Sequence, residues 1–496
     1  MRCAAPVVAI ALLLSACAVG PDFERPVPPT AKDYGSAPMT GRTVGSTAAG
    51  VDAQRFVADM DIPAQWWTLF RSAKLTRLVD DAQRANPNVA AAQAALRQAH
   101  ELYAAQWTSL LPTVQGGFSA SRAHNADSAI ANPTVSPTPT YNLYTAQLNV
   151  SYALDVFGGT RRAIESAGAQ EEASRFELEA TYLTLSSNVV VTAMQEASLR
   201  AQIASIERLL QLQHQLTDLV HRQRELGTAS LVDVLAQESA EAQTAQLLPP
   251  LEKQLAQTRD ALTALLGRLP SEEPQETFTL DELTLPTDLP VSLPSKLVRQ
   301  RPDVRQAEAN VHAATAQVGV AIADMFPQFS IDAGTGSSAL KIGELFAPGT
   351  TFWSVGGSLA QTLFDAGALL HKRRAADAAM DQAAAQYRAT VILACQNVAD
   401  TLHALKWDAD AVKASTQAAD AAERTYDLAQ RQFKLGTISF VALLNAEQAY
   451  RQAEITLAQA RANRYADTAG LFQALGGGWW NRIEEARNEG SGSPRK

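Results

Sequence analysis

Histidine pairs and adjacent carboxylates come nearest to a chemical site in this sequence. His214 and His221 lie seven residues apart, which is two helical turns, whereas helical metal pairs such as HExxH use one turn. Glu171 and Glu172 are neighbours in a charge-rich stretch that is typical of a solvated helix face. The sequence also has no GxSxG, no phosphate-binding glycine loop and no CxxC pair. We therefore expect no enzyme, no cofactor and no resident metal.

One cysteine stands where exported bacterial proteins are lipidated. The first sixteen residues, MRCAAPVVAIALLLSA, contain one basic residue and an apolar run too short to cross a bilayer, as a secretory signal does. LSAC, ending at Cys17, has the form of a lipobox, so we expect cleavage before Cys17 and its acylation by fatty acids such as palmitate. Ala18 is not acidic, which favours sorting to the outer membrane. The alternative is an ordinary signal peptide with Cys17 as a bystander.

Composition favours long, closely packed helices over a globular core. Aromatic residues make up only 6% of the 496 residues, while Ala and Gln are plentiful. The formal net charge of −9 argues against nucleic acid as a partner. Cys3 leaves with the signal peptide, so no disulfide between core cysteines is expected, and Cys395 is expected to be a small, buried helix residue.

Composition also divides the chain. A segment rich in Pro, Gly, Thr and Ser follows the lipobox and is expected to be a flexible, lipidated tether. Order is expected to begin near WWTLF, Trp66–Phe70, before an amphipathic helix over Ser72–Arg84. The expected divisions are a signal peptide at 1–16, the tether at 17–58, structural repeats at 59–270 and 295–478, a linker at 271–294 between them, and a tail at 479–496.

The two repeats are visible as matched sequences. ANPNVAAAQAAL, Ala85–Leu96, corresponds to QRPDVRQAEANV, Gln300–Val311. In each copy a second proline follows at the same distance from the first, and proline is favoured at the start of a helix and past its end. Each repeat therefore contains a helix of matched length that leads into a new element.

After the second proline the period changes from helical to alternating. In YNLYTAQLNVSYALD, Tyr141–Asp155, apolar and polar residues alternate, which predicts a strand. Aromatic residues near the ends and the length of the runs are typical of membrane-spanning strands. A half-buried soluble sandwich is the alternative, but nothing else in the chain supplies a covering layer. Four strands cannot close a barrel, so it must be shared among chains. The strands are expected at about 112–123, 141–156, 327–337 and 351–364.

Long proline-free stretches follow each pair of strands. They predict helices of about 100 Å at 1.5 Å per residue, each followed by a returning helix, in hairpins at 161–266 and 366–475. LPPLE, Leu248–Glu252, is expected to break the first returning helix, whereas the second has no matching proline. Heptad-spaced seams predict side-by-side packing of the helices. The seams comprise Leu209, Leu212, Leu216 and Leu219 in the first hairpin, Ala419, Ala422, Tyr426, Ala429 and Phe433 in the second, and Ala442, Ala446, Ala449, Ala453 and Ala460 on the last returning helix.

Several short motifs recur in order along the chain: GPDFERPVPP after the lipobox, LDVFGG at 154–159, RPDV at 301–304, LFDAG at 363–367, two LGT turns and ALGGGWW at 474–480. With these motifs the chain resembles the outer-membrane factors of tripartite, RND-type efflux systems, the TolC, OprM and NodT type of lipoprotein. The resemblance covers nearly the whole mature chain. It implies a TolC-like mixed membrane protein, with mostly long α-helices in a periplasmic α-barrel and four transmembrane β-strands per chain in a trimeric twelve-stranded β-barrel.

The function implied by this resemblance is a passive exit duct for multidrug-resistance efflux in a Gram-negative bacterium. The expected assembly is a homotrimer, lipid-anchored in the outer membrane and in contact with its lipid. Its periplasmic tip would meet a membrane-fusion adaptor and, through it, an inner-membrane RND-type transporter. Two alternatives stay open: the outer-membrane duct of a type I protein-secretion system, and a non-conducting coiled-coil envelope lipoprotein, against which the alternating strands argue.

Both repeats contain the same turn. Gly227 and Gly436 are predicted to be left-handed residues past the last helical turn, and Thr228 and Thr437 to cap the returning helices. The resemblance implies that these tips dock the adaptor. The predicted docking residues are Arg222, Leu226, Gly227, Thr228, Arg431, Leu435, Gly436 and Thr437.

The resemblance also implies a periplasmic gate beside the tips. TolC carries two carboxylates one turn apart on its second returning helix, and the corresponding positions here are Ala442 and Asn445. Asp233 is the equivalent of the first position, but in the other repeat. With Phe433, these residues form the predicted gate. Because carboxylate rings favour cations, a weaker cation preference than that of TolC is expected.

Overall fold

A computed structural model describes residues 18–31, 33–34, 41–45, 52–124 and 140–482. Cys17 and the signal peptide therefore lie outside the described residues. The chain forms two compact units, and each unit draws on both sequence repeats. The described residues within Met1–Pro26, Leu96–Ala173 and Ala307–Tyr387 form the strand unit. Those within Val27–Ala95, Ser174–Gln306 and Arg388–Lys496 form the helical unit.

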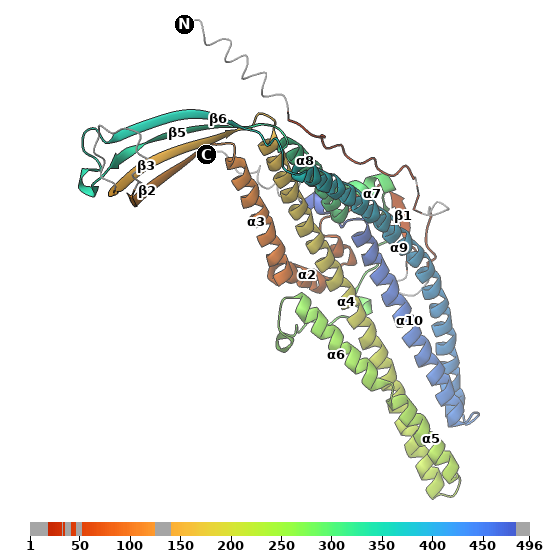
Figure 1. The fold of residues 1–496 in the computed structure, drawn as a ribbon. Coiled ribbons are helices and arrows are strands. Elements are labelled where there is room, and N and C mark those ends of the chain that lie inside the picture. The colour runs from red at the N-terminus through yellow and green to blue at the C-terminus, as the bar shows by residue number, and fades with distance from the viewer. Residues whose placement is uncertain (1–17, 32, 35–40, 46–51, 125–139, 483–496) are drawn as a thin grey trace, which may run out of the picture. The chain divides into compact units, whose positions relative to one another are not determined.

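The strand unit contains one antiparallel sheet in the order β2-β3-β5-β6 (Figure 1). Each repeat contributes two neighbouring strands, and β3 pairs with β5 across the repeats. The alternating periods of the sequence therefore predicted the right number of strands for this sheet. The pairing of β3 with β5 shows in addition how the two pairs of strands join. The strands are β2 (Thr113–His124), β3 (Thr140–Leu154), β5 (Gln328–Ala339) and β6 (Thr351–Ala360).

Each repeat continues from its strands into a long helix and a return. In the first, α4 (Gly159–Glu225) is followed by α5 (Leu231–Ala245) and α6 (Leu248–Leu265). In the second, α9 (Ala368–Lys434) is followed by the uninterrupted α10 (Phe440–Ala474) (Figure 1). The break at LPPLE is thus confirmed, because its prolines stand in the first turn of α6, where no backbone donor is needed. None of the described helices is both long and apolar enough to cross a membrane.

Shorter helices precede the strands. Ser72 Oγ accepts a hydrogen bond of 3.3 Å from Leu75 N and so caps the predicted amphipathic helix. Leu75, Leu78 and Val79 on this helix are buried. Pro87 and Pro302, the first prolines of the two matched sequences, are the first residues of two further helices of equal length, as expected. These helices are α2 (Ala73–Ala85), α3 (Pro87–Thr108), α7 (Pro294–Gln300) and α8 (Pro302–Ala323).

An aromatic core in the helical unit joins the two ends of the chain. Trp66, in the short helix η1 (Trp66–Phe70), stacks on Phe472 of α10 with ring centroids 5.4 Å apart. Trp479 Nε1 donates to the Gln300 carbonyl oxygen at 2.6 Å. The start of the expected tail at 479–496 is therefore packed on the helices, because its tryptophans bury apolar area and find hydrogen-bond partners.

Part of the expected tether at 17–58 is also ordered. Strand β1 (Arg55–Ala58) pairs in parallel with β4 (Asp288–Val291), ahead of WWTLF. The buried Arg464 of α10 donates to Asp52 O at 2.7 Å and to Gln54 Oε1 at 3.2 Å. The expectation of a flexible tether is therefore wrong for residues 52–58, because a buried guanidinium needs acceptors and this segment supplies them.

The seams of the helical hairpins are only partly as expected. Leu209, Leu216, Ala419 and Ala429 are buried, but the alanines expected to form the seam of α10 are not. The buried face of α10 instead begins at Leu443 and Leu444, because larger side chains bury more apolar area. Near the tips, Leu444 packs in one cluster with Leu216, Val220 and Val234, so the two hairpins are in contact.

Candidate channel wall and hairpin tips

The sheet has one apolar and one polar face. One row of paired residues across the four strands is Val114, Val150, Ala333 and Val355, and the neighbouring row on the other face is Gln115, Asn149, Gly334 and Ser354. The alternation noticed in single strands therefore lies in register across both repeats. Such a sheet suits a wall between lipid on one side and water on the other.

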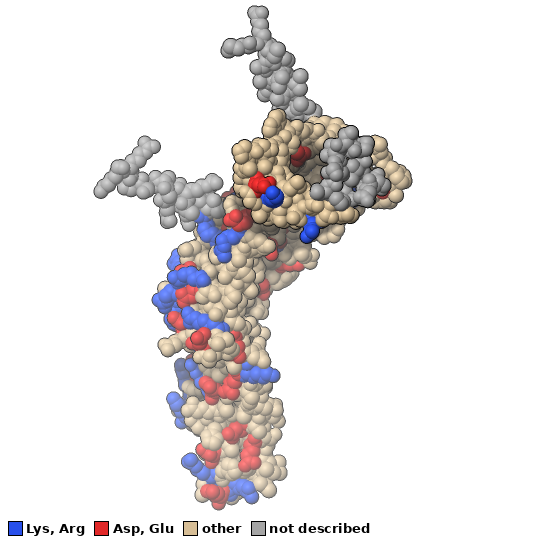
Figure 2. Space-filling model, turned by 60° about the vertical axis from the view of Figure 1, so that its left-hand side comes forward, with Lys and Arg blue, Asp and Glu red and all other residues tan. Residues whose placement is uncertain are grey.

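The apolar face is uncovered in this chain. Val114, Phe118, Trp353, Val355 and Leu359 are all exposed. Charged side chains are nearly absent from the strands, which contain only one arginine and one aspartate. By contrast, Figure 2 shows Lys and Arg interspersed with Asp and Glu over the helical unit, without a large area of one sign on this face. The strand unit thus has the surface of a membrane-embedded sheet.

Both edges of the sheet are open. Within the described residues, β2 pairs only with β3, and β6 pairs only with β5. These edge strands have 12 and 10 residues. A long edge of unpaired backbone groups is a template for another strand. In a lipid environment it must be paired, because no water is present to satisfy it.

An aspartate in each repeat caps the helix that follows the strands. Asp155 accepts hydrogen bonds from Thr160 N and Arg161 N at 2.9 and 3.0 Å. Asp365 accepts from Leu369 N and Gly367 N at 2.6 and 2.8 Å, and these backbone donors lower the pKa of its carboxyl group. Sequence reasoning used LDVFGG and LFDAG only as family motifs. The aspartate before a glycine and a helix was the available signal for a cap.

The two hairpin tips share a backbone geometry. Gly227 and Gly436 have φ of 74° and 73°, so the predicted left-handed glycine is confirmed in both repeats. A Cβ at either position would meet no atom within 4 Å, so only the backbone conformation requires glycine. Leu226 and Leu435 beside them are 79% and 77% exposed. The other predicted docking residues are exposed on the same turns: Arg222, Thr228, Arg431 and Thr437.

The predicted role of the two threonines as helix caps is wrong. Thr228 Oγ1 and Thr437 Oγ1 each donate at 2.9 Å to a carbonyl of the preceding helix, that of Gln223 and that of Gln432. They therefore close the end of the outgoing helix. Their hydroxyls lie next to the unpaired carbonyls of that helix, because the left-handed glycine turns the chain back before the returning helix begins.

Serines two residues further along cap the returning helices. Ser230 Oγ accepts from Asp233 N at 3.2 Å, and Asp233 Oδ2 accepts from Ser230 N at 2.8 Å, which completes a capping box. Hydrogen bonds from Ser230 lower the pKa of Asp233. In the second repeat Ser439 Oγ accepts from Ala442 N at 3.2 Å, without an acidic partner.

The predicted gate residues lie on or beside the tips. Asp233, Ala442 and Asn445 are exposed in the single chain. Phe433 contacts Phe440, with ring centroids 5.2 Å apart. Asp233 thus caps the returning helix of its own hairpin. The second repeat has the neutral side chains of Ala442 and Asn445 at the corresponding place.

His214 and His221 both lie on α4, and their side chains are exposed. His214 Nδ1 lies 2.9 Å from Glu241 Oε1, and His221 Nε2 lies 3.1 Å from Glu238 Oε1, so each histidine faces a carboxylate of α5. The bond to Glu241 raises the pKa of His214. Among the described residues no group of three or more His, Cys, Asp or Glu is arranged to hold a metal.

Sequence reasoning missed a buried ionic cluster between α9 and α10. Glu447, whose side chain is 4% exposed, lies 3.1 Å from Arg451, which also binds Glu454 at 2.8 Å. Tyr426 stacks on Tyr450 with ring centroids 5.8 Å apart. Burial and the nearby Glu454 raise the pKa of Tyr450 to about 12. The spacing of Glu447, Arg451 and Glu454 along the helix was the signal that could have indicated ion pairs.

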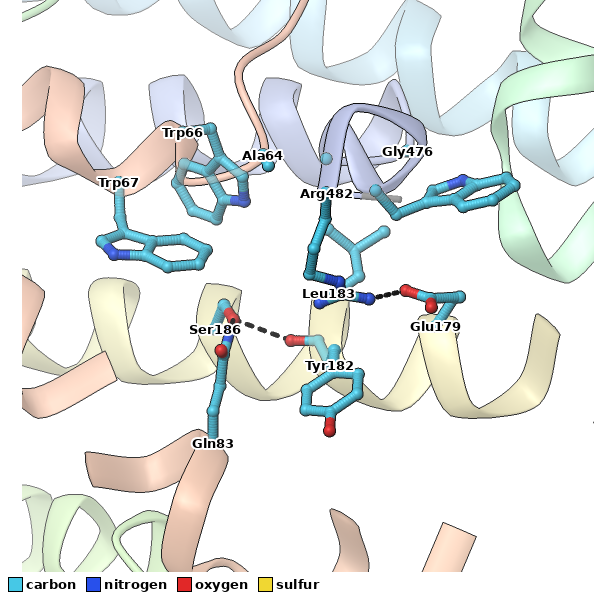
Figure 3. A pocket seen from close by; sticks show the side chains of 12 residues that line it. Ala64, Trp66, Trp67, Gln83, Glu179, Tyr182, Leu183, Ser186, Gly476 and Arg482 are labelled. Carbon is cyan, nitrogen blue, oxygen red and sulfur yellow. Dashed lines mark hydrogen bonds and ion pairs between the residues drawn. The ribbon is translucent and has the colours of Figure 1, made fainter. Parts of the chain in front are cut away.

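A small pocket in the helical unit is also lined by polar residues (Figure 3). Arg482 pairs with Glu179 and lies over the ring of Tyr182, with its guanidinium carbon 4.6 Å from the centroid. Ser186 Oγ donates to the Tyr182 carbonyl at 2.8 Å. The cavity volume is about 20 Å³, roughly enough for one water.

Sheet, hairpins and tips together define a channel-forming envelope protein. The chain belongs to the outer membrane efflux protein family, whose model matches residues 78–268 and 293–477. This membership places the chain in the outer membrane as a channel protein. The two matched stretches are similar in extent and fall one in each repeat.

Named relatives span nearly the full chain. The pyoverdine export outer membrane protein OpmQ of Pseudomonas putida is 28% identical over 474 residues, covering 95% of this chain and 96% of the relative. The toluene efflux pump outer membrane protein TtgC of the same species is 27% identical over 489 residues, covering 97% and 96%. The names of these two relatives refer to chemically different compounds, pyoverdine and toluene.

Solved structures share the fold. The outer-membrane channel OprN is 27% identical, with a TM-score of 0.79, and the match covers 93% of this chain and 100% of that one. The CmeC channel of Campylobacter jejuni is 20% identical, with a TM-score of 0.84 and coverage of 96% and 98%. The chain therefore has the TolC-like fold that the sequence motifs implied.

Proposed function

We propose that three copies of this chain form the outer-membrane channel of a tripartite efflux pump, a passive exit duct for drugs or other small molecules. The observation that carries this proposal is a two-faced sheet with two unpaired edges. In an assembly, β2 of one copy pairs with β6 of the next. Eight strands make a barrel whose interior side chains fill it, whereas the twelve strands of three copies leave a lumen.

The periplasmic end of the assembly is proposed to dock an adaptor and, through it, an RND-type inner-membrane transporter. Support comes from the repeated geometry of the tips, each with an exposed leucine beside a left-handed glycine. Two similar tips per chain become six around a trimer. An adaptor could then bind a repeating surface, and aliphatic side chains at its centre suit a protein contact.

Lipid attachment at Cys17 is part of the same proposal. LSAC and the non-acidic Ala18 support an acylated N-terminus that inserts into the outer membrane. The strands already anchor an assembled barrel, so the lipid adds a second attachment.

Two measurements test this function. Purified protein in planar bilayers is expected to give discrete conductance steps, and expression in a strain without its own efflux channels is expected to restore drug resistance when a matching adaptor and transporter are supplied. Absence of any conductance would favour a non-conducting envelope lipoprotein. Export of a protein substrate without any change in drug resistance would favour a type I secretion duct.

A further inference from the structure

The first described residues, Ala18–Arg25, are held in the strand unit by contacts that neither the lipobox nor the channel function explains. We call this segment the strap. Its contacts begin where β3 ends: Val19 N donates to the Phe157 carbonyl oxygen at 3.0 Å. Ala18 lies so close to Gly158 that a Cβ there would be 2.6 Å from Ala18 Cα. The residue next to Cys17 is thus in contact with the junction between β3 and α4.

A buried arginine donates hydrogen bonds to the strap. Arg162 of α4, whose side chain is 6% exposed, donates from Nη2 to Asp22 Oδ1 at 2.6 Å. Its Nε and Nη2 also reach the carbonyl oxygens of Val19 and Gly20, at 3.3 and 3.4 Å. Glu165 binds the other side of the guanidinium at 2.8 Å. A buried guanidinium has strict partner requirements, so these acceptors make a specific site for the strap.

The strap also contacts α8, which comes from the second repeat. Gly20, with φ of 96°, lies against Gly319, and a Cβ on Gly20 would be 2.5 Å from Gly319 Cα. Phe23 stacks on His312 with ring centroids 4.3 Å apart and planes 16° apart. Arg25 Nε pairs with Glu308 Oε1 at 3.0 Å. One short segment therefore contacts both α4 and α8.

We infer that the strap is an intramolecular clamp that joins the two repeats at the base of the sheet, and that insertion of the strands depends on it. The inference rests on the proposed function in one respect, that the strands insert into the outer membrane as a shared barrel. The contacts described above are made by residues 18–25, so docking of the strap is expected to persist when Cys17 carries no lipid.

The strap offers a matched pair of substitutions. Gly20→Ala introduces a Cβ that cannot fit against Gly319, whereas Gly41→Ala carries a similar backbone penalty at φ of 134° with no atom within 4 Å. Phe23→Ala removes the ring stack without a clash, and serves if Gly20→Ala fails to fold. A nitroxide on Glu24→Cys, an exposed strap position, reports docking once Cys395 is replaced by Ser.

The experiment measures nitroxide mobility and the yield of inserted oligomer in the full-length protein. Gly20→Ala and Phe23→Ala are expected to increase mobility several-fold and to lower the yield, and Gly41→Ala to match the parent. Cys17→Ser, exported with a non-lipoprotein signal peptide, is expected to keep the label immobile. A label as immobile in Gly20→Ala and Phe23→Ala as in the parent would overturn the inference, as would a label freed by Cys17→Ser. Mass spectrometry of the N-terminus tests lipidation separately, so an unmodified Cys17 would refute the lipid and leave the docking result standing.

Discussion

At the scale of single residues, the glycines of the hairpin tips are required by the backbone conformation and not by lack of space. Gly227 and Gly436 are required by φ, yet the space around them is open. A non-glycine residue there costs roughly 1 kcal/mol or more. That cost is small beside the packing of two long hairpins. Changes at these positions therefore act mainly on what approaches the tips.

We predict that the double variant Gly227→Trp, Gly436→Trp loses efflux while its trimers still assemble and insert. The indole groups would cover the surface proposed to meet the adaptor, and the sheet belongs to the other unit of the chain. Drug susceptibility and cross-linking to the adaptor are the measurements. The matched Ala, Ala variant carries the same backbone cost without the bulk and is expected to retain most resistance. Full resistance in the Trp variant would contradict the prediction.

The gate residues predict weak ion selectivity. Ala442 and Asn445 carry no charge, and Asp233 is bound within its own capping box. We expect single-channel recordings to show a modest preference for cations that hardly changes in Asp233→Asn. Asn445→Asp should increase the preference, because each chain then adds a carboxylate to the proposed constriction. Strong cation selectivity that disappears in Asp233→Asn would show that Asp233 forms the ring after all.

His214 predicts a pH dependence in the first hairpin. Its pKa is raised by the hydrogen bond to Glu241 and by the nearby Asp218 and Glu241 charges. The stabilisation is therefore fully present below the ordinary histidine pKa of about 6.5 and is lost as the pH rises through the higher folded value. Hydrogen exchange of α5, corrected for intrinsic rates, should be slower at pH 6 than at pH 8.

A matched pair of variants checks the assignment to His214. His214→Gln should reduce the pH difference in α5, whereas His403→Gln, at an exposed position of α9, should leave it unchanged. An equal pH difference in His214→Gln and the parent protein would rule out this histidine as its source.

At the scale of elements, α10 contains two ion pairs that differ in the exposure of the carboxylate. Glu447, 4% exposed, pairs with Arg451, while Arg461 of the same helix, itself 16% exposed, pairs with Asp281, whose side chain is 81% exposed. Removing one partner of a buried pair leaves an uncompensated charge. Exposed pairs contribute little, because water and salt screen them. The effects of removing Arg451 and Arg461 can therefore be compared within one helix.

Arg451→Ala is expected to destabilise the protein by roughly 3–5 kcal/mol, and Arg461→Ala by about 1 kcal/mol or less. The measurement is the denaturant midpoint of the assembled protein in detergent, followed by circular dichroism. Glu447→Gln combined with Arg451→Met should recover part of the loss, because the carboxylate that then loses its arginine is Glu454, whose side chain is 26% exposed. Equal midpoints for the two single variants would contradict this account.

At the scale of the whole molecule, the open sheet predicts an oligomer. Four strands per chain leave two edges that must be paired in lipid. Three copies give 3 × 4 = 12 strands, an even number within the known bacterial range. Native mass spectrometry in detergent is expected to show three copies. A stable monomer with a closed barrel would refute the assembly and, with it, the six-tip docking surface.

The sequence predictions that the structure confirmed depend on rules that involve only a few consecutive residues. Alternation along Tyr141–Asp155 predicted a strand because side chains on a strand point to opposite faces in turn. The glycine of each LGT turn predicted a left-handed residue, and LPPLE predicted the break before α6, because these depend on the backbone of a few consecutive residues. Fold and family followed from the order and repetition of such local signals.

The tertiary structure decided what depends on residues far apart in the chain. Asp22 of the strap pairs with Arg162, Arg464 binds the segment at Thr43 and Gln54, and Glu447 is buried between α9 and α10. Even the choice of Ser230 over Thr228 as the cap depended on where the outgoing helix ends. A charged residue has the same local sequence signature whether it is solvated or buried, and only its distant partners determine which it becomes.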